Sequence, residues 1–335
     1  MAQAHGTPIA ILGNGGFGTA LALAFEQASL RPTLWGHDPA YTERIARSRE
    51  NPRYLPGVLL PAGVLVSSDA AAVVRDARCV LCAVPTQHLR AVLAGLAAHI
   101  PTHAAMVSLS KGLEEATSRR PSEVIAEVLG PRPIAVLSGP SHAEEIARGM
   151  PASMVVASAD PALARDLQAL LTTPTLRLYR NQDPIGVELC GALKNIISIA
   201  AGVADGLGLG DNAKAALLTR GLAEMARFGV ALGAQRETFF GLAGVGDLFT
   251  TAVSAHGRNR ALGQRLGQGE TLEDILAGTR KVAEGVWTSR AVLRTAKDKG
   301  LDMPITEQVV AVLFQGKSPR DVVRDLMNRF PKEES

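Results

Sequence analysis

The sequence predicts an α/β protein in which a mostly parallel, doubly wound sheet is followed by a second, all-helical domain. Its 335 residues exceed the roughly 100–200 that one domain usually contains. Short β-rich segments alternate with helical patterns in the N-terminal half, which is typical of a parallel sheet covered on both faces. From Gly186 onward strand signals are scarce, and long segments rich in Ala, Leu and Gly have helical spacing. We therefore predict two domains, residues 1–185 and 186–335.

The first predicted strand covers residues 8–12 (PIAIL), and an amphipathic helix follows at 17–28. A second strand over 33–35 precedes a charged helix that continues through Arg49. The other predicted strands are 64–66, 79–84, 105–109, 134–137 and 154–157. The helices predicted after Gly186 are 187–203, 212–232, 257–266, 272–276, 289–299, 306–314 and 319–329. All predicted strands thus belong to the first domain.

The composition argues against several classes of protein. The net charge of +3 and the aromatic content of 4% do not suit a nucleic-acid-binding surface. Three cysteines cannot form a disulfide framework, and Cys79 and Cys82, three apart in a predicted strand, point to opposite faces and cannot share a metal. The first 30 residues lack Lys and Arg, and no uninterrupted apolar run approaches the roughly 18 residues that span a bilayer. We expect a cytoplasmic protein without a metal, a membrane span or a nucleic-acid partner.

The sequence GNGGFG, which begins at Gly13, fits the GxGxxG pattern between a predicted strand and a predicted helix. In this context Gly13 permits a tight turn, Gly15 lets a pyrophosphate approach the backbone, and Gly18 allows the helix to pack closely on the strand. The helix N-terminus then faces the phosphates. The motif predicts a Rossmann-type domain that binds NAD or NADP, and a glycine-rich turn without a ligand is the alternative.

The acidic residue that usually binds the adenosine ribose is displaced. The second strand ends at Trp35-Gly36-His37-Asp38, so that His37 precedes the nearest acid. Without a carboxylate at the ribose 2′-oxygen a 2′-phosphate is tolerated better, which leaves NAD and NADP equally open. The alternative is that His37 and Asp38 cap the following helix.

Lys194 is the main candidate for proton transfer. In a helix over 187–201 its neighbours at three, four and seven positions are all small or apolar: Val187, Cys190, Gly191, Ile197, Ser198 and Ala201. Burial on such a face lowers the pKa of a lysine, which suits proton exchange near pH 7. The alternative is a lysine at a helix edge whose ammonium group reaches solvent.

Lysine is rare in this chain, in which 8 of the 35 basic residues are Lys and the others are Arg. Only Lys111, Lys194 and Lys214 precede Lys281. An Arg-favouring genome explains the ratio, but the remaining lysines are weak indicators of positions where Arg cannot serve.

The sequence Gly257-Arg258-Asn259-Arg260 opens a predicted helix and is a candidate phosphate site. Arg offers bidentate contacts to phosphate, Asn adds neutral donors, and the helix start adds backbone N–H groups. A solvated basic helix start is the alternative.

With these motifs the chain resembles the bacterial NAD(P)-dependent glycerol-3-phosphate dehydrogenase family over nearly its full length. The resemblance implies an enzyme that interconverts dihydroxyacetone phosphate and sn-glycerol 3-phosphate and supplies glycerol 3-phosphate for phospholipid biosynthesis. It leaves the oligomeric state open, with a homodimer as the candidate. The matching stretches are, in order, GNGGFGTALA, LWGHD, NPRYLPG, AVPTQ, SKGLE, SGPSHAEEIA, ELCGALKNIISIAAGVADGLGLGDNAKAALLTRGLAEM, GLAGVGDLFTT, GRNR, VAEG and MPITE.

The resemblance also implies roles for individual residues. Lys194 corresponds to the proton donor and acceptor, Lys111 to a lysine between cofactor and substrate, and Asp247 to the aspartate of GDL. Substrate contacts are implied for Lys111, Gly139, Ser141, Lys194, Asp247, Thr251, Gly257, Arg258 and Asn259. With the glycine motif, the cofactor contacts are Gly13, Gly15, Gly16, Phe17, Gly18, His37, Lys111, Ala143, Arg258, Val282 and Glu284.

The chain departs from the family pattern at three positions. Gly257 stands where bacterial members often have Ser, so that only its backbone can contact a ligand and one phosphate contact is in question. Asn14 and Gly16 stand where Ala and Ser are common, and Gly16 offers only a backbone donor.

Three other classes of protein share parts of this pattern. A β-hydroxyacid or 6-phosphogluconate dehydrogenase would need a carboxylate-binding constellation. A nucleotide-sugar dehydrogenase would need a nucleophilic cysteine, and Cys190 beside the lysine lacks a His partner in sequence. A non-catalytic NAD(H) sensor would have no reason to retain Lys111, Lys194 and Asp247 together.

Overall fold

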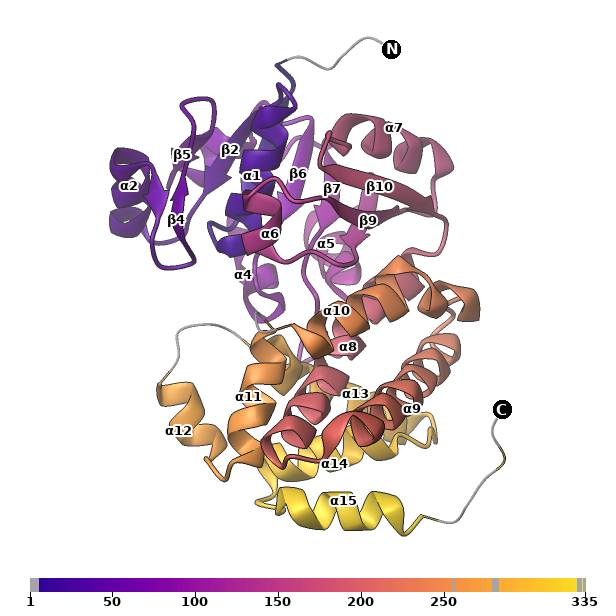
Figure 1. Ribbon diagram of the computed structural model, residues 1–335. Helices are drawn as coiled ribbons and strands as arrows, with labels where there is room; N and C mark the ends of the chain where they lie inside the picture. Colours follow the sequence, from indigo (N-terminus) through magenta and orange to yellow (C-terminus); the bar gives the residue numbers. More distant parts are fainter. Residues whose placement is uncertain (1–5, 255–256, 279–282, 330–332, 334–335) are drawn as a thin grey trace.

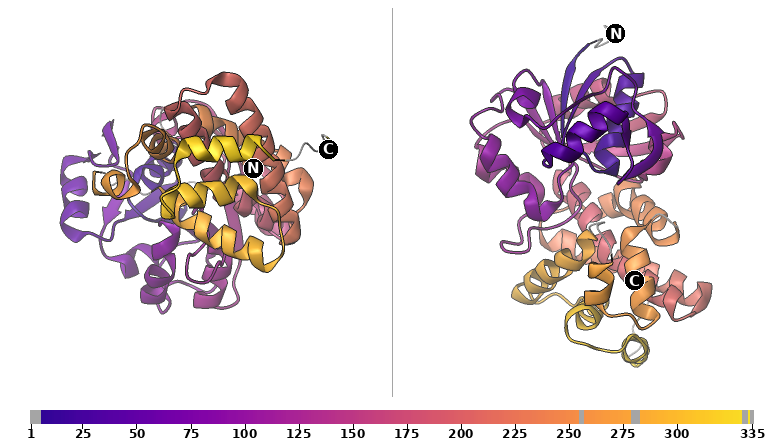
Figure 2. Two further views of the ribbon diagram at one scale, coloured as in Figure 1. Left: turned by 90° about the horizontal axis from the view of Figure 1, so that it is seen from below. Right: turned by 90° about the vertical axis from the view of Figure 1, so that its left-hand side faces the viewer.

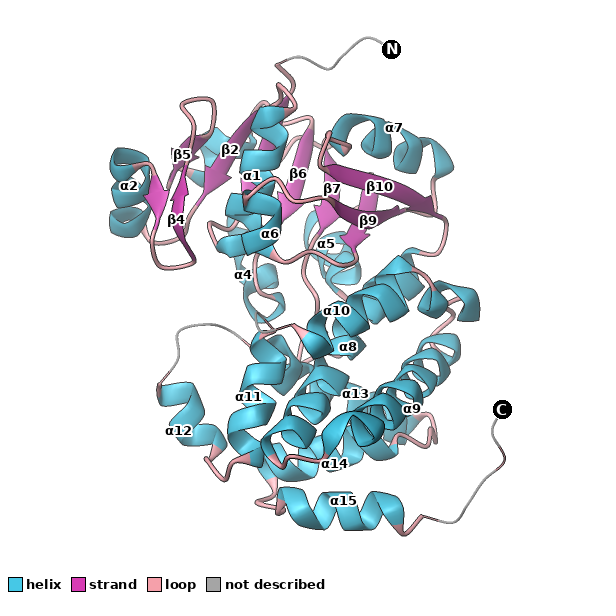
Figure 3. Cartoon of the chain, in the orientation of Figure 1, coloured by secondary structure: helices cyan, strands magenta, loops and turns pink. Residues whose placement is uncertain are grey.

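The computed structural model describes residues 6–254, 257–278, 283–329 and 333, so that Val282, a predicted cofactor residue, lies outside the described residues. The N-terminal unit is a mostly parallel sheet with helices on both faces, and a helical unit lies below it (Figure 1). Figure 3 shows that the strands are confined to the N-terminal unit, and the described residues beyond Asn181 form helices and no strand. The predicted fold class is confirmed.

The main sheet has eight strands in the order β10-β9-β8-β7-β6-β1-β2-β5. Neighbouring strands run parallel except for β8 and β9, which are antiparallel. The chain leaves β1 toward β2 and later returns to β6, so the order reverses between β1 and β6, where ligands bind in such sheets. The strands are β1 Pro8–Leu12, β2 Arg31–Trp35, β5 Leu65–Ser67, β6 Cys79–Cys82, β7 Ala105–Ser108, β8 Ile134–Ser138, β9 Ala152–Ala157 and β10 Leu176–Asn181.

The helices of the N-terminal unit cover both faces of this sheet, as the turned views of Figure 2 also show. Side chains from the two faces enter separate apolar cores, one containing Cys79 and the other Cys82, which confirms that these cysteines point in opposite directions. The helices are α1 Gly16–Gln27, α2 Pro39–Ser48, α3 Ala70–Val74, α4 Thr86–Leu96, α5 Pro121–Leu129, α6 Ala143–Ala147 and α7 Pro161–Leu171.

The helical unit is built around α8, Pro184–Gly206, which is buried along most of its length. Val136 of β8 and Val155 of β9 belong to the same apolar core as α8, so this core joins the two units. The helices around α8 are α9 Gly210–Ala231, α10 Asp247–Val253, α11 Arg258–Gly267, α12 Leu272–Ala277, α13 Glu284–Asp298, α14 Pro304–Phe314 and α15 Pro319–Met327.

Helix α8 has the length and the mean hydropathy, 1.5 over its most apolar window, of a membrane-spanning helix. The longest uninterrupted apolar run does not identify α8 as such a helix, because Glu188 and Lys194 interrupt the run. The whole window is buried inside the protein, where α8 packs against the sheet and the other helices.

Some elements were not predicted. The hairpin of β3 Glu50–Asn51 and β4 Leu55–Leu59 was missed because Pro and Gly within β4 weaken the strand signal. Strand β10 was missed because it is an edge strand whose residues alternate between buried and exposed only briefly. The glycine-rich stretch before α10 forms a 3₁₀ turn, Arg236–Phe240, and a π-helical turn, Leu242–Gly246, which follow no simple hydrophobic period.

The glycine loop shows why the motif needs glycine. Gly13 has a φ of +115°, and a Cβ there would lie 2.6 Å from the carbonyl oxygen of Ala83. A Cβ at Gly18 would lie 2.1 Å from the carbonyl oxygen of Gly13, whereas a Cβ at Gly15 would meet no atom within 4 Å. Gly13 and Gly18 are therefore required by the fold, and Gly15 leaves space in front of the backbone.

We expect Gly18→Ala to lower the free energy of unfolding by about 1–3 kcal/mol, because the added methyl group pushes α1 away from the loop. Gly95→Ala on the exposed side of α4, where a Cβ meets no atom within 4 Å, should instead raise this energy by about 0.5 kcal/mol. Urea unfolding followed by circular dichroism measures both changes. Equal stability of the two variants would contradict this account of the loop.

Candidate active site

The predicted catalytic residues Lys194, Lys111 and Asp247 meet in one cluster. The Lys194 Nζ donates hydrogen bonds to Asp247 Oδ1 at 2.6 Å and to Thr251 Oγ1 at 2.6 Å. The Lys111 Nζ donates to the other carboxylate oxygen of Asp247 at 2.7 Å. One buried carboxylate therefore bridges two ammonium groups.

The sheet positions Lys111 and the loop that contacts it. Lys111 follows β7, and Gly139 and Ser141 follow β8, at the same edge of the sheet because β7 and β8 are parallel. The Lys111 Nζ donates to the Gly139 carbonyl oxygen at 2.9 Å and to Ser141 Oγ at 3.0 Å. Gly139 has a φ of +134°, and a Cβ there would lie 3.1 Å from the Cα of Met154, so the turn requires glycine.

The helical unit supplies the other half of the cluster. Lys194 lies in the middle of α8, and Asp247 and Thr251 lie one turn apart on α10, which packs against α8 directly below the sheet unit (Figure 1). A Cβ atom built at Gly191 of α8 would lie 3.2 Å from the Lys111 side chain. Gly191, one of the small neighbours that predicted burial of Lys194, thus also makes room for the second lysine.

Burial is the main influence on the charges of this cluster. It lowers the pKa of Lys194 to about 7; the Asp247 carboxylate opposes this effect, while the Lys111 ammonium adds to it. Burial alone would raise the pKa of Asp247, but the two ammonium groups hold it below its usual range. The cluster therefore combines a charged carboxylate with a lysine that exchanges protons near neutral pH.

The candidate phosphate residues lie at the start of α11. Gly257 is the N-cap, and Arg258 and Asn259 form the first turn, whose backbone N–H groups attract anions. Asn259 Oδ1 accepts a hydrogen bond from the Gly285 N–H at 3.1 Å, which orients its amide nitrogen as a donor. The positive charge of Arg258 is close enough to lower the pKa of Lys194.

Gly257 has a steric reason for departing from the family pattern. A Cβ at this position would lie 2.5 Å from the carbonyl oxygen of Thr251, a residue that contacts Lys194. A serine would therefore require α10 and α11 to separate, and only the backbone of Gly257 is available to a ligand.

Several of the residues predicted to bind the cofactor lie around the start of α1. A Cβ at Gly16 would lie 3.5 Å from the Cβ of Ala143 and 2.9 Å from the carbonyl oxygen of Tyr54, so α6 and the β3–β4 hairpin both adjoin the glycine loop. Phe17 packs against the core of the sheet unit, and His37 is exposed beyond the end of β2. The open space at Gly15 and the N-terminus of α1 fit a dinucleotide pyrophosphate.

Asp38 caps α2, as one of the two interpretations of this segment predicted. Its Oδ1 accepts the Tyr41 N–H at 3.1 Å, and its Oδ2 lies 4.0 Å from the Arg53 guanidinium, which stacks 4.1 Å above the Tyr41 ring. Both the capping acid and a nearby cation thus lie at the end of β2, which leaves the choice between NAD and NADP open.

Glu284 connects the two units instead of pointing freely toward a cofactor. Its carboxylate accepts the Thr86 N–H at 2.7 Å and the Lys111 N–H at 3.2 Å.

The prediction missed Asn195, whose Nδ2 donates to the Lys111 carbonyl oxygen at 2.7 Å. Its position next to Lys194 in the sequence was the available signal for it.

Cys190, beside the predicted catalytic lysine in the same helix, has a structural role. Burial raises the pKa of the Cys190 thiol well above its usual value, so Cys190 is a packing residue and does not suit a nucleophile. Within the part of the chain that the structure describes, no group of three or more His, Cys, Asp or Glu side chains could hold a metal ion.

A Rossmann-type sheet whose carboxyl edge faces a buried lysine and aspartate defines a nicotinamide-dependent dehydrogenase with a separate helical unit. Two family models match, NAD-dependent glycerol-3-phosphate dehydrogenase N-terminus over residues 8–164 and the C-terminus over residues 183–324. The chain belongs to the NAD-dependent glycerol-3-phosphate dehydrogenase family. This membership confirms the predicted family and cofactor class over the other three classes of protein.

The chain is similar to named members along its whole length. It is 49% identical over 327 residues to glycerol-3-phosphate dehydrogenase (NAD(P)+) of Streptomyces coelicolor, covering 97% of each chain. It is 47% identical over 329 residues to the enzyme of Geobacillus kaustophilus, covering 97% of this chain and 96% of that one. The crystal structure of glycerol-3-phosphate dehydrogenase from Coxiella burnetii superimposes with a TM-score of 0.93 at 37% identity, covering 97% and 99% of the two chains.

We expect Asp247→Asn to lower the pKa of Lys194 by about 1–3 pH units, because the carboxylate opposes the effects of burial and of Lys111. Protein labelled with ¹³C-lysine reports this pKa through the Cε resonance of Lys194, which Lys194→Met identifies by its loss. In the unsubstituted protein this resonance should titrate near pH 7. A titration midpoint that stays unchanged or rises in Asp247→Asn would contradict the electrostatic account.

Proposed function

We propose that this protein catalyses the reversible reduction of dihydroxyacetone phosphate to sn-glycerol 3-phosphate with NADH or NADPH. The observation that carries the proposal is the buried Lys194, held between Asp247 and Thr251 at 2.6 Å from each and facing the carboxyl edge of the sheet. The family to which the chain belongs and the matching substrate named for its relatives support this reaction. The bound nicotinamide supplies or accepts the hydride.

Lys194 acts as the proton donor to the carbonyl oxygen during reduction and as the acceptor in reverse. A pKa of about 7 makes both protonation states available at neutral pH. Among the described residues, Asp247 and Thr251 accept two of its three N–H donors, and the third can reach a substrate oxygen. Asp247 and Thr251 thus fix the direction in which the proton is transferred.

Lys111 stabilises the negative charge that develops on the substrate oxygen. Its three N–H donors contact Asp247, the Gly139 carbonyl and Ser141 Oγ. The Ser141 hydroxyl also donates to the Gly139 carbonyl at 2.9 Å, so it can release Lys111 without losing its own partner. A substrate oxygen can therefore replace Ser141 at Lys111.

Arg258, Asn259 and the N-terminus of α11 hold the substrate phosphate, with the Gly257 backbone beside them. Binding the phosphate away from the reacting carbon orients the carbonyl toward the hydride donor and Lys194. Phosphate recognition by a guanidinium, an amide and a helix N-terminus requires no metal ion.

Three further proposals follow from the family assignment. The enzyme acts in the cytoplasm, and its product supplies phospholipid biosynthesis. Residues 1–185 form the cofactor-binding domain and residues 186–335 the substrate-binding domain. The start of α8 at Pro184, just after β10 ends at Asn181, supports this division.

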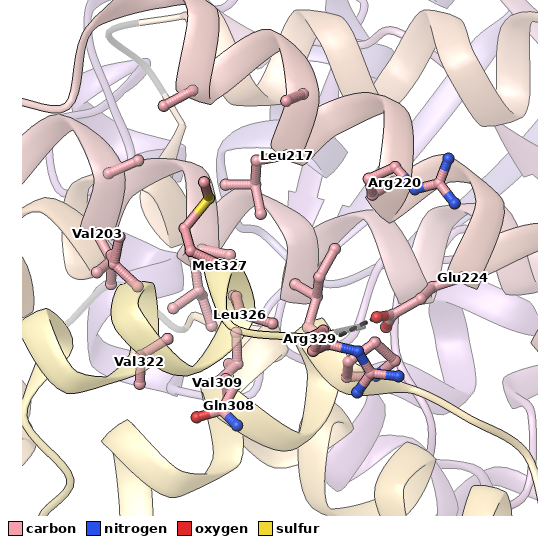
Figure 4. A pocket seen from close by; sticks show the side chains of 18 of the residues that line it. Val203, Leu217, Arg220, Glu224, Gln308, Val309, Val322, Leu326, Met327 and Arg329 are labelled. Atoms are coloured by element: carbon pink, nitrogen blue, oxygen red, sulfur yellow. Dashed lines mark hydrogen bonds between the residues drawn. The ribbon is translucent and has the colours of Figure 1, made fainter. Parts of the chain in front are cut away.

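We also propose a homodimer that buries a groove on the helical unit. This cavity of about 490 Å³ lies between α8, α9, α14 and α15, and its wall carries apolar side chains such as Val203, Leu217 and Met327 (Figure 4). Apolar surface of this kind typically marks an interface, and Met327 is 78% exposed.

We expect Lys194→Met to reduce kcat by about 10²–10⁴-fold with dihydroxyacetone phosphate, because the proton donor is lost. Lys194→Arg should be similarly impaired, since Arg keeps its proton at neutral pH. Steady-state oxidation of NADH and NADPH gives kcat, and nucleotide fluorescence titration should show unchanged cofactor affinity as the control. Near-normal turnover by Lys194→Met would refute the assignment.

We expect Met327→Glu to weaken dimerisation at least about tenfold, because the charge would be buried in the groove interface. Sedimentation velocity at several protein concentrations measures the monomer–dimer equilibrium. Leu59→Glu on β4, where Leu59 is 71% exposed and far from the groove, is the matched control. A monomeric unsubstituted protein, or equal dimerisation of Met327→Glu, would show that the groove is not a dimer interface.

A further inference from the structure

We propose that Asp205 is a positioning residue for the substrate phosphate, because it fixes α11, which carries Arg258 and Asn259, against α8, which carries Lys194. The inference rests on the proposed function, since it concerns the phosphate site of that reaction. It assigns roles to Lys214 and Arg260, two basic residues that the reaction itself does not use.

Asp205 forms a three-residue ion cluster with both cations. Lys214 Nζ lies 2.9 and 3.0 Å from the two carboxylate oxygens of Asp205, and Arg260 Nε lies 2.6 Å from Oδ2. The three side chains are 16–20% exposed, so solvent screens the cluster only partly. The carboxylate thereby links the end of α8, the start of α9 and the first turn of α11.

The charges of this cluster stand at helix ends that do not favour them. Asp205 lies in the last turn of α8, where the helix dipole disfavours a carboxylate. Lys214 lies near the start of α9, where the dipole disfavours a cation. Local helix stability therefore does not explain these residues, whereas their contacts with each other and with Arg260 do.

Helices α8 and α11 are in close backbone contact next to the cluster. Each helix carries two glycines four residues apart, Gly202 and Gly206 on α8 and Gly263 and Gly267 on α11. Cβ atoms at Gly202 and Gly263 would each lie 2.0 Å from a carbonyl oxygen of the other helix. The two backbones are therefore in direct contact, with no side chains between them. A small rotation of α11 about this contact would move its first turn relative to α8.

Arg260 sets that rotation. It lies two residues after Arg258 in the same turn, and its Nε–H donates to Asp205 while Nη1 contacts the Ser254 carbonyl oxygen at 3.4 Å. These contacts direct its guanidinium toward α8 and α10. Within GRNR, Arg258 and Asn259 thus remain for the phosphate, and Arg260 holds the helix in place.

Asp205 itself lies far from the reacting carbon. It follows Lys194 by three turns of α8, a distance of about 16 Å along the helix axis at 1.5 Å per residue. Loss of Asp205 should therefore weaken phosphate binding while leaving proton transfer by Lys194 and cofactor binding unchanged.

The test uses the full-length enzyme with Asp205→Ala and two ketone substrates, dihydroxyacetone phosphate and the phosphate-free dihydroxyacetone. We expect KM for dihydroxyacetone phosphate to rise about 10–100-fold, with kcat and the KM for NADH or NADPH changed less than about twofold. The kcat/KM with dihydroxyacetone should stay unchanged, because that substrate makes no use of the phosphate site. A merely structural role would lower activity with both ketones alike.

Three further variants sharpen the result. Asp205→Glu keeps the carboxylate and should recover most of the affinity. Arg260→Gln should reproduce the effect, and combining it with Asp205→Ala should add little, because both remove one interaction. Glu270→Ala breaks an ion pair between Arg265 and Glu270 at the other end of α11 and should leave all kinetic constants unchanged.

Each outcome decides the proposal. Unchanged KM in Asp205→Ala, or an equal loss with both ketones, overturns the positioning role. If Asp205→Ala does not fold, Arg260→Gln provides the same comparison of the two ketones. An unsubstituted enzyme that does not reduce dihydroxyacetone phosphate would instead overturn the proposed function, and the positioning role with it.

Discussion

The structure depends on one buried carboxylate. Asp247 accepts hydrogen bonds from Lys194 and Lys111, which belong to different structural units and would repel each other at this separation without it. Breaking a buried cluster of this kind leaves an unpaired charge inside the protein, which costs about 3–5 kcal/mol. Asp247 therefore both joins the sheet unit to the helical unit and keeps a lysine that titrates near neutral pH at their interface.

Two other carboxylates, the buried Glu188 of α8 and the partly buried Glu284 of α13, also connect the helical unit to the sheet unit. Glu188, two turns before Lys194, accepts hydrogen bonds from Ser108 Oγ at 3.0 Å and from the Ser122 N–H at 2.8 Å, both in the sheet unit. Burial raises the pKa of Glu188, so its hydrogen bonds and Arg120 are needed to keep the charge there. With Glu284 at Thr86 and Lys111, polar contacts join the two units at three places, and the apolar core around α8 joins them as well.

The sequence predicted features that depend on local pattern. The glycine motif, the alternation of strands and helices, and the burial of Lys194 each follow from residues within a few turns of one another. The partners of Lys194 could not be derived this way, because Asp247 lies 53 residues away and follows a π-helical turn without hydrophobic period. The scarcity of lysine pointed to Lys111 and Lys194, but the structure pairs Lys214 with Asp205, a contact for which the sequence carried no signal.

The N-termini at the two candidate phosphate sites lack a side-chain cap. Helices α2, α7 and α8 begin with aspartates whose carboxylates accept their own backbone N–H groups. Helices α1 and α11 begin with Gly15 and Gly257, which have no side chain to do so, and their first-turn N–H groups remain donors for a phosphate. The glycine at 257 therefore exchanges one hydroxyl contact for a closer backbone and an uncapped helix. This keeps in place the carbonyl of Thr251, whose hydroxyl accepts a hydrogen bond from Lys194. It also gives the departure from the family pattern a physical reason.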